Sequence, residues 1–135
     1  MVLKENNHRQ KKAWKNKKFS ASIKHALQGL KTIVTEERNM RKHISFGIFP
    51  ILLGWFFKVS PIEWIIIITC IFLVIIMEFL NTIFETVVDM VTDYTFHPLA
   101  KKAKDIAAGA VLVTGIFTLI VAAIIFLPKF ISLFI

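Results

Sequence analysis

A run of polar side chains interrupts an otherwise apolar stretch of the sequence. Within residues 78–89, Glu78, Asn81, Thr82, Glu85 and Asp89 recur at intervals of three and four. At about 3.6 residues per turn, these positions share one face of a helix. The opposite positions are filled by apolar residues. The spacing therefore predicts a helix that carries a polar stripe at the end of an apolar segment.

The chemistry available to this stripe is that of carboxylates. Mg²⁺ is usually held by one or two carboxylates together with substrate phosphates. A carboxylate can instead accept a proton from an alcohol. Glu78 follows three apolar residues and precedes Phe79 and Leu80, so a helix end emerging into water does not explain it. Because an ionised group in an apolar span is costly unless it is paired, hydrated or metal-bound, we interpret Glu78 as functional.

Further charged side chains are expected at the same membrane level. They are Glu36 and Glu37 in the charged turn 36–43, and His97, Lys101, Lys102, Lys104 and Asp105 after the stripe. Acids for a metal and bases for phosphates favour phosphoryl transfer with MgATP. Neither GxxxxGK[ST] nor GxGxxG occurs in the sequence. From these residues alone the alternative is a proton- or cation-coupled transporter subunit, whose three spans would have to oligomerise to enclose a pathway.

The elements that position these residues are expected to be membrane helices. Hydrophobic residues make up 56% of the 135 residues, above the roughly 45–50% of soluble domains. We expect an all-α integral membrane protein with three spans, at about residues 41–57, 62–90 and 106–127. A polar loop is expected at 91–105, and Pro128 and Lys129 are expected to end the third span.

The segment before the spans predicts a surface helix. In residues 18–35, apolar residues recur at helical spacing and leave lysines on other faces, a pattern too polar to span a membrane. Such a helix lies in the membrane interface, packs against the protein's own spans, or does both. Residues 1–17 are interpreted as a flexible basic cytoplasmic tail, and residues 18–135 as one membrane domain.

The distribution of charge predicts the orientation. The net charge is +8, and 12 of the 17 Lys and Arg residues precede Ile44. Basic residues crowded beside a first span follow the positive-inside rule and do not indicate nucleic acid binding. The N-terminus and the 91–105 loop are therefore expected on the cytoplasmic side, with the C-terminus outside.

The stripe reads E-x-x-N-T-x-x-E-x-x-x-D and resembles the signature of the prokaryotic diacylglycerol kinase family. Other pieces agree in order, namely His25-Ala26-x-x-Gly29, Glu37-Arg38-Asn39, Ile62-Glu63-Trp64 and the run from His97 to Val111. The resemblance covers roughly residues 18–128. It looks most like the Gram-positive branch, whose members act mainly on undecaprenol.

The resemblance implies a homotrimer in the bacterial cytoplasmic membrane, with active sites shared between neighbouring subunits. It implies ATP- and Mg²⁺-dependent phosphorylation of a lipid alcohol, undecaprenol to undecaprenyl phosphate. The alternative within the family is diacylglycerol phosphorylation to phosphatidic acid.

The resemblance also assigns roles to residues of this sequence. Glu78 would be the catalytic base supported by Asn81, and Glu37 and Glu85 would hold Mg²⁺. The nucleotide site would comprise Lys18, His25, Glu37, Glu85, Phe96, His97, Lys104 and Asp105. Lipid contacts are expected at Glu78, Arg41 and Ala108, with phosphate as the alternative partner of Arg41. Two departures are Ile83, where the family has a small residue, and a stretch 89–97 that is one residue longer than the family's pattern.

Overall fold

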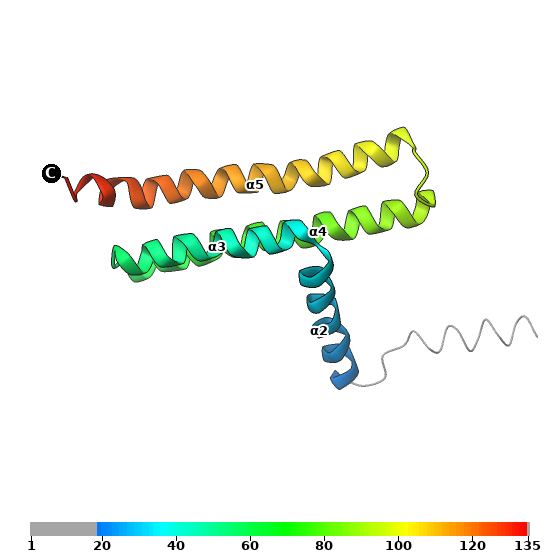
Figure 1. The fold of residues 1–135 in the computed structure, drawn as a ribbon, viewed down its shortest axis with the longest axis horizontal. Coiled ribbons are helices and arrows are strands. Elements are labelled where there is room, and N and C mark those ends of the chain that lie inside the picture. The colour runs from blue at the N-terminus through cyan, green and yellow to red at the C-terminus, as the bar shows by residue number, and fades with distance from the viewer. Residues whose placement is uncertain (1–18, 135) are drawn as a thin grey trace, which may run out of the picture.

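The structure is a computed structural model that describes residues 19–134, and this part of the chain forms four helices (Figure 1). They are α2 (Phe19–Glu36), α3 (Arg38–Phe56), α4 (Pro61–Thr92) and α5 (Pro98–Ile131). The expected tail 1–17 and the expected nucleotide ligand Lys18 lie outside the described residues. Within those residues, the all-α prediction is confirmed.

Two helices, α4 and α5, are long and apolar enough to cross a membrane. α3 is not among them, since its first turns carry Arg38, Arg41, Lys42 and His43. Many large apolar side chains of α4 and α5 are exposed, for example Ile62 at 71% and Leu119 at 72%. Exposed apolar surface on this scale is expected where lipid is the solvent.

The prediction of a polar loop over residues 91–105 is wrong. α4 continues to Thr92, α5 begins at Pro98, and only residues 93–97 connect them. Asp93 ends α4 in the left-handed conformation, and the His97 side chain accepts a hydrogen bond from the Leu99 N–H as the N-cap of α5. Proline is favoured at the first helical position because no hydrogen bond needs its missing N–H there.

Two other predicted boundaries also shift. The expected charged turn at 36–43 reduces to Glu37, because α3 begins at Arg38. Pro128 and Lys129 do not end the last helix, which continues to Ile131. A proline inside a helix removes one backbone hydrogen bond, and the turns on either side keep theirs.

The three long helices pack together at the end that contains the α3–α4 turn, residues 57–60, which we call the turn end. Its core consists of Val59, Ile67, Ile125 and Phe126. The Glu63 side chain and the Ser60 N-cap form a capping box at the start of α4. Lys129 Nζ lies 2.9 Å from Glu63 Oε1 and ties α5 to α4 there.

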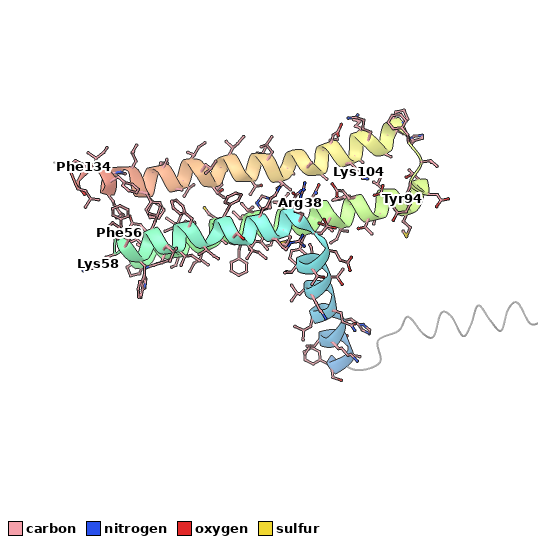
Figure 2. The ribbon with its side chains drawn as sticks, in the orientation of Figure 1. Arg38, Phe56, Lys58, Tyr94, Lys104 and Phe134 are labelled. Carbon is pink, nitrogen blue, oxygen red and sulfur yellow. The ribbon has the colours of Figure 1, made fainter. Side chains whose placement is uncertain are left out.

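The opposite end, which contains residues 93–97, is called the loop end. α2 leaves the bundle at a corner marked by Arg38, which lies part-way along the bundle (Figure 2). Lys104 and, nearer the loop end, Tyr94 lie beyond this corner, so α4 and α5 extend past α3 toward the loop end. Arg41 Nη1 donates hydrogen bonds to the carbonyls of Val34 and Thr35, at 3.2 and 2.7 Å, and so fastens the corner.

Close packing of α3 on α4 depends on a glycine. A Cβ added to Gly54 would lie 2.9 Å from the Trp64 ring. We therefore expect Gly54→Ala to lower the free energy of unfolding by about 1–3 kcal/mol, because ring and helix must move apart. Thermal unfolding in detergent measures this. Gly29→Ala is the matched control, since a Cβ there meets nothing within 4 Å. Equal stability of the two variants would contradict the packing role of Gly54.

Candidate functional site

Glu78 and Asn81 are the two buried polar residues in the described part of the chain, with 2% and 5% of their surface exposed. Both lie on α4 where the apolar part of the helix gives way to the polar stripe. The neighbouring helix supplies one partner to the acid, since His43 Nε2 on α3 lies 3.8 Å from Glu78 Oε2. The predicted catalytic residues are thus buried side chains of α4 in the region where α3 packs beside it.

Asn81 lies between Glu78 and Glu85 on the polar stripe of α4. Asn81 Nδ2 donates a hydrogen bond of 3.3 Å to Glu85 Oε1, one turn toward the loop end. Within the described chain, Asn81 Oδ1 and Thr82 Oγ1 are buried without a hydrogen-bond partner. Buried polar atoms are nearly always paired, so the stripe has hydrogen-bonding capacity left for a ligand or another subunit.

Two further carboxylates, those of Glu37 and Glu85, act on Glu78 at this level. Glu37 is the N-cap residue of α3, between α2 and α3. The charges of Glu37 and Glu85 are close enough to Glu78 to act on its carboxyl group. The α2–α3 corner therefore brings an acid from outside α4 to the polar stripe, as the resemblance implies for the metal site.

The donor set suits a magnesium ion that arrives with a nucleotide. Within residues 19–134, no three His, Cys, Asp or Glu side chains gather closely enough to hold a metal ion by themselves. Mg²⁺ usually takes only one or two carboxylates and completes its shell with phosphates and water. Glu37 and Glu85 fit that requirement, and they do not form a dedicated all-protein cage.

The polar stripe continues toward water at the loop end. Along the helix axis, Glu85 lies about 10 Å and Asp89 about 16 Å beyond Glu78. Both are half-buried. Lys104 Nζ on α5 donates a hydrogen bond of 2.7 Å to Asp89 Oδ1 and links the two long helices. Lys104, a predicted nucleotide ligand, is thus held in place by an acid of the stripe.

The other predicted nucleotide ligands of this region lie around a cavity at the loop end. Its volume is about 450 Å³, and its lining includes Phe96, His97, Lys104 and Asp105. His97 Nδ1 accepts the Leu99 N–H at 3.2 Å, which leaves Nε2 to face other groups. Asp105 pairs with Lys101, four residues earlier on α5. The structure thus brings these four predicted residues together.

His25 is not brought to this cavity within one chain. It lies exposed on α2, with Nδ1 3.1 Å from Gln28 Oε1, and α2 leaves the bundle to one side, roughly across the direction of α4 and α5 (Figure 1). The Arg41 guanidinium donates its hydrogen bonds to carbonyls of α2. Its contact with lipid therefore stays a prediction. Ala108 lines a larger, mostly apolar cavity of about 1050 Å³ between α3, α4 and α5, which also reaches His43.

Sequence reasoning missed His43. It follows Arg41 and Lys42 and therefore resembles one more member of a basic flank before a span. Its partner Glu78 is on another helix, so no local spacing connects them. The available signal was the helical spacing between His43 and Glu37. The six residues that separate them span nearly two helical turns, so a helix that begins beside Glu37 carries His43 deeper along the bundle than the predicted metal ligand.

Comparisons with known proteins agree with this geometry. The family model described as prokaryotic diacylglycerol kinase matches residues 24–126. An undecaprenol kinase from Bacillus subtilis (strain 168) is 41% identical over 112 residues, covering 83% of this chain and 90% of that protein.

Diacylglycerol kinases are also similar. One from Synechocystis sp. is 37% identical over 83% of this chain and 64% of its own length. One from Helicobacter pylori (strain J99) is 36% identical over 75% of this chain and 78% of its own length. The match to the family model includes all of α4 with its polar stripe and most of α5. The chain therefore belongs to the prokaryotic diacylglycerol kinase family.

Proposed function

We propose that this membrane protein transfers the γ-phosphoryl group of ATP to the hydroxyl of a membrane lipid, and that the lipid is undecaprenol. The observation that carries the proposal is Glu78, a 2% exposed acid between an apolar helix segment and a stripe of half-buried acids. A lipid hydroxyl arrives from the apolar side, and a nucleotide arrives from the polar side. Family membership supports lipid kinase activity.

Glu78 serves as the general base. Its carboxylate accepts the proton of the lipid hydroxyl while the lipid oxygen bonds to the γ-phosphorus. The bond between that phosphorus and the β–γ bridging oxygen breaks, and ADP leaves. Asn81 positions the neighbouring carboxylate of Glu85 through its 3.3 Å hydrogen bond. In phosphoryl transfer of this kind, the protein mainly positions the reactants and balances charge.

Glu37 and Glu85 would hold Mg²⁺, which neutralises charge on the nucleotide phosphates. Lys104 and the cavity at the loop end, lined by Phe96, His97 and Asp105, bind the nucleotide. Lys104 shares its ammonium group with Asp89 and so keeps a fixed direction toward the stripe. In the proposed site, metal and nucleotide lie on the solvent-facing side of Glu78.

The active enzyme is a homotrimer whose sites join residues of neighbouring subunits. Support comes from His25, which does not line the loop-end cavity within one chain, and from the buried atoms of Asn81 and Thr82 that lack a partner in the described residues. α3 is the third span, with its basic first turns at the cytoplasmic interface and α2 lying along that interface. The N-terminus is then cytoplasmic and the C-terminus is outside, in the cytoplasmic membrane of a bacterium.

The choice of undecaprenol rests on the similarity to the Bacillus subtilis undecaprenol kinase. Diacylglycerol is the second candidate, because the other similar proteins are diacylglycerol kinases. Purified protein given either lipid with MgATP labelled at the γ-phosphate distinguishes them. We expect faster labelling of undecaprenol. Preferential labelling of diacylglycerol would contradict the substrate, and no labelled lipid at all would favour a transporter.

We predict that Glu78→Gln lowers lipid phosphorylation by at least about 100-fold, since an amide cannot accept the proton. Glutamine keeps the size of the side chain, so the oligomer is expected to remain intact. Transfer of label to lipid measures the rate, and size-exclusion chromatography in detergent checks the assembly. Activity near that of the unmodified protein would remove the base assignment.

We predict that Glu85→Gln raises the Mg²⁺ concentration needed for half-maximal rate by about tenfold, because one oxygen ligand loses its charge. Titration of the rate with Mg²⁺ measures this. Glu63→Gln is the control, because Glu63 lies on the same helix at the turn end and pairs with Lys129. If both variants required the same Mg²⁺ concentration as the unmodified protein, Glu85 would not be a metal ligand.

A further inference from the structure

We propose that His43 is a positioning residue for Glu78. Its imidazolium keeps Glu78 in the carboxylate form and then passes on to water the proton that Glu78 takes from the lipid. This inference rests on the proposed role of Glu78 as base. His43 lies on α3, in the basic run Arg41-Lys42-His43, and basic residues of this kind commonly flank a membrane span.

The geometry places the two side chains as an ion pair between helices. His43 Nε2 lies 3.8 Å from Glu78 Oε2, a separation typical of an ion pair and slightly longer than a hydrogen bond. The Glu78 side chain is 3% exposed, whereas that of His43 is 29% exposed. The imidazole therefore contacts the buried acid and also reaches the surface.

The other charges around Glu78 make this partner necessary. Glu85 from α4 and Glu37 from the start of α3 both act on the Glu78 carboxyl group, and both are acids. Like charges and dehydration each disfavour an ionised carboxylate, and an opposite charge within about 4–6 Å favours it. Of the basic side chains in the described chain, that of His43 lies within ion-pair distance of Glu78.

Two other basic groups near this level have partners of their own. Lys104, from α5, pairs with Asp89, and Arg41 binds the carbonyls that end α2. Lys42 lines the larger cavity together with His43 and Asn39 and belongs to none of the ion pairs of the described residues. Support for the charged form of Glu78 therefore comes from His43.

The pair also gives the proton a way out. Before the reaction, Glu78 is a carboxylate and His43 carries a proton. Glu78 accepts the hydroxyl proton as the lipid oxygen bonds to phosphorus. The imidazolium releases its proton to water and then takes the proton from Glu78. This transfer restores the starting pair, so one proton leaves per turnover. Histidine suits this role because its charge changes near neutral pH.

The test compares three variants of the full-length protein in detergent with undecaprenol and MgATP. For His43→Gln we expect kcat to fall about 10- to 100-fold, with the KM values for ATP and lipid within about twofold of the original. The acid side of the pH–rate profile should move upward by about one pH unit, because Glu78 loses the charge that keeps it ionised. Activity should return in part at higher pH.

His43→Lys keeps a positive charge and is expected to leave the acid side of the profile in place. Lys42→Gln removes a neighbouring charge and is expected to change neither kcat nor the profile. A uniform loss of rate at every pH in His43→Gln, or the same shift in Lys42→Gln, would overturn the proposal. If His43→Gln fails to fold, an unshifted profile in His43→Lys supports the proposal and an upward shift overturns it.

These outcomes are separable from the failure of the proposed function. If Glu78→Gln were inactive while His43→Gln kept its rate and its pH–rate profile, only the proposed role of His43 would be contradicted. An active Glu78→Gln variant would remove the base itself.

Discussion

The structure depends on keeping one carboxylate, that of Glu78, almost completely out of water at the end of an apolar helix. Dehydrating an ionised acid is costly unless a nearby charge compensates for it. That compensation comes from α3, through the 3.8 Å approach of His43. α3 must therefore lie close along α4, and the glycine contact with the Trp64 ring allows this. The same burial suits the proposed role of Glu78 as a base.

The α4 helix arranges its chemistry by depth. After Glu63 in its first turn the helix is mainly apolar, Glu78 is buried beside His43 of α3, and Glu85 and Asp89 follow half-buried toward the loop end. A lipid hydroxyl and a charged nucleotide require opposite surroundings. One helix with a gradual change from apolar to polar lets the two meet without either crossing the other's environment. Lys104 and the cavity at the loop end extend the polar side onto α5.

Periodicity was enough to predict most helices and the stripe. The surface helix expected at 18–35 is observed at Phe19–Glu36, since an amphipathic repeat is a local property. The start of α5 was predicted too late, because Lys101, Lys102 and Lys104 resemble a loop although His97 and Pro98 form a helix start. His43 was missed because its meaning depends on packing between helices far apart in sequence. The metal ligands, by contrast, were assigned through family resemblance and stay predictions.

The central claim is that the acids are divided between proton transfer at Glu78 and metal binding at Glu85. The most direct test replaces Mg²⁺ with Mn²⁺ and measures bound Mn²⁺ by electron paramagnetic resonance, with a non-hydrolysable ATP analogue present. We predict that Glu78→Gln binds Mn²⁺ and nucleotide as the unmodified protein does, while Glu85→Gln binds Mn²⁺ about tenfold more weakly. Equal loss of Mn²⁺ in both variants would contradict it.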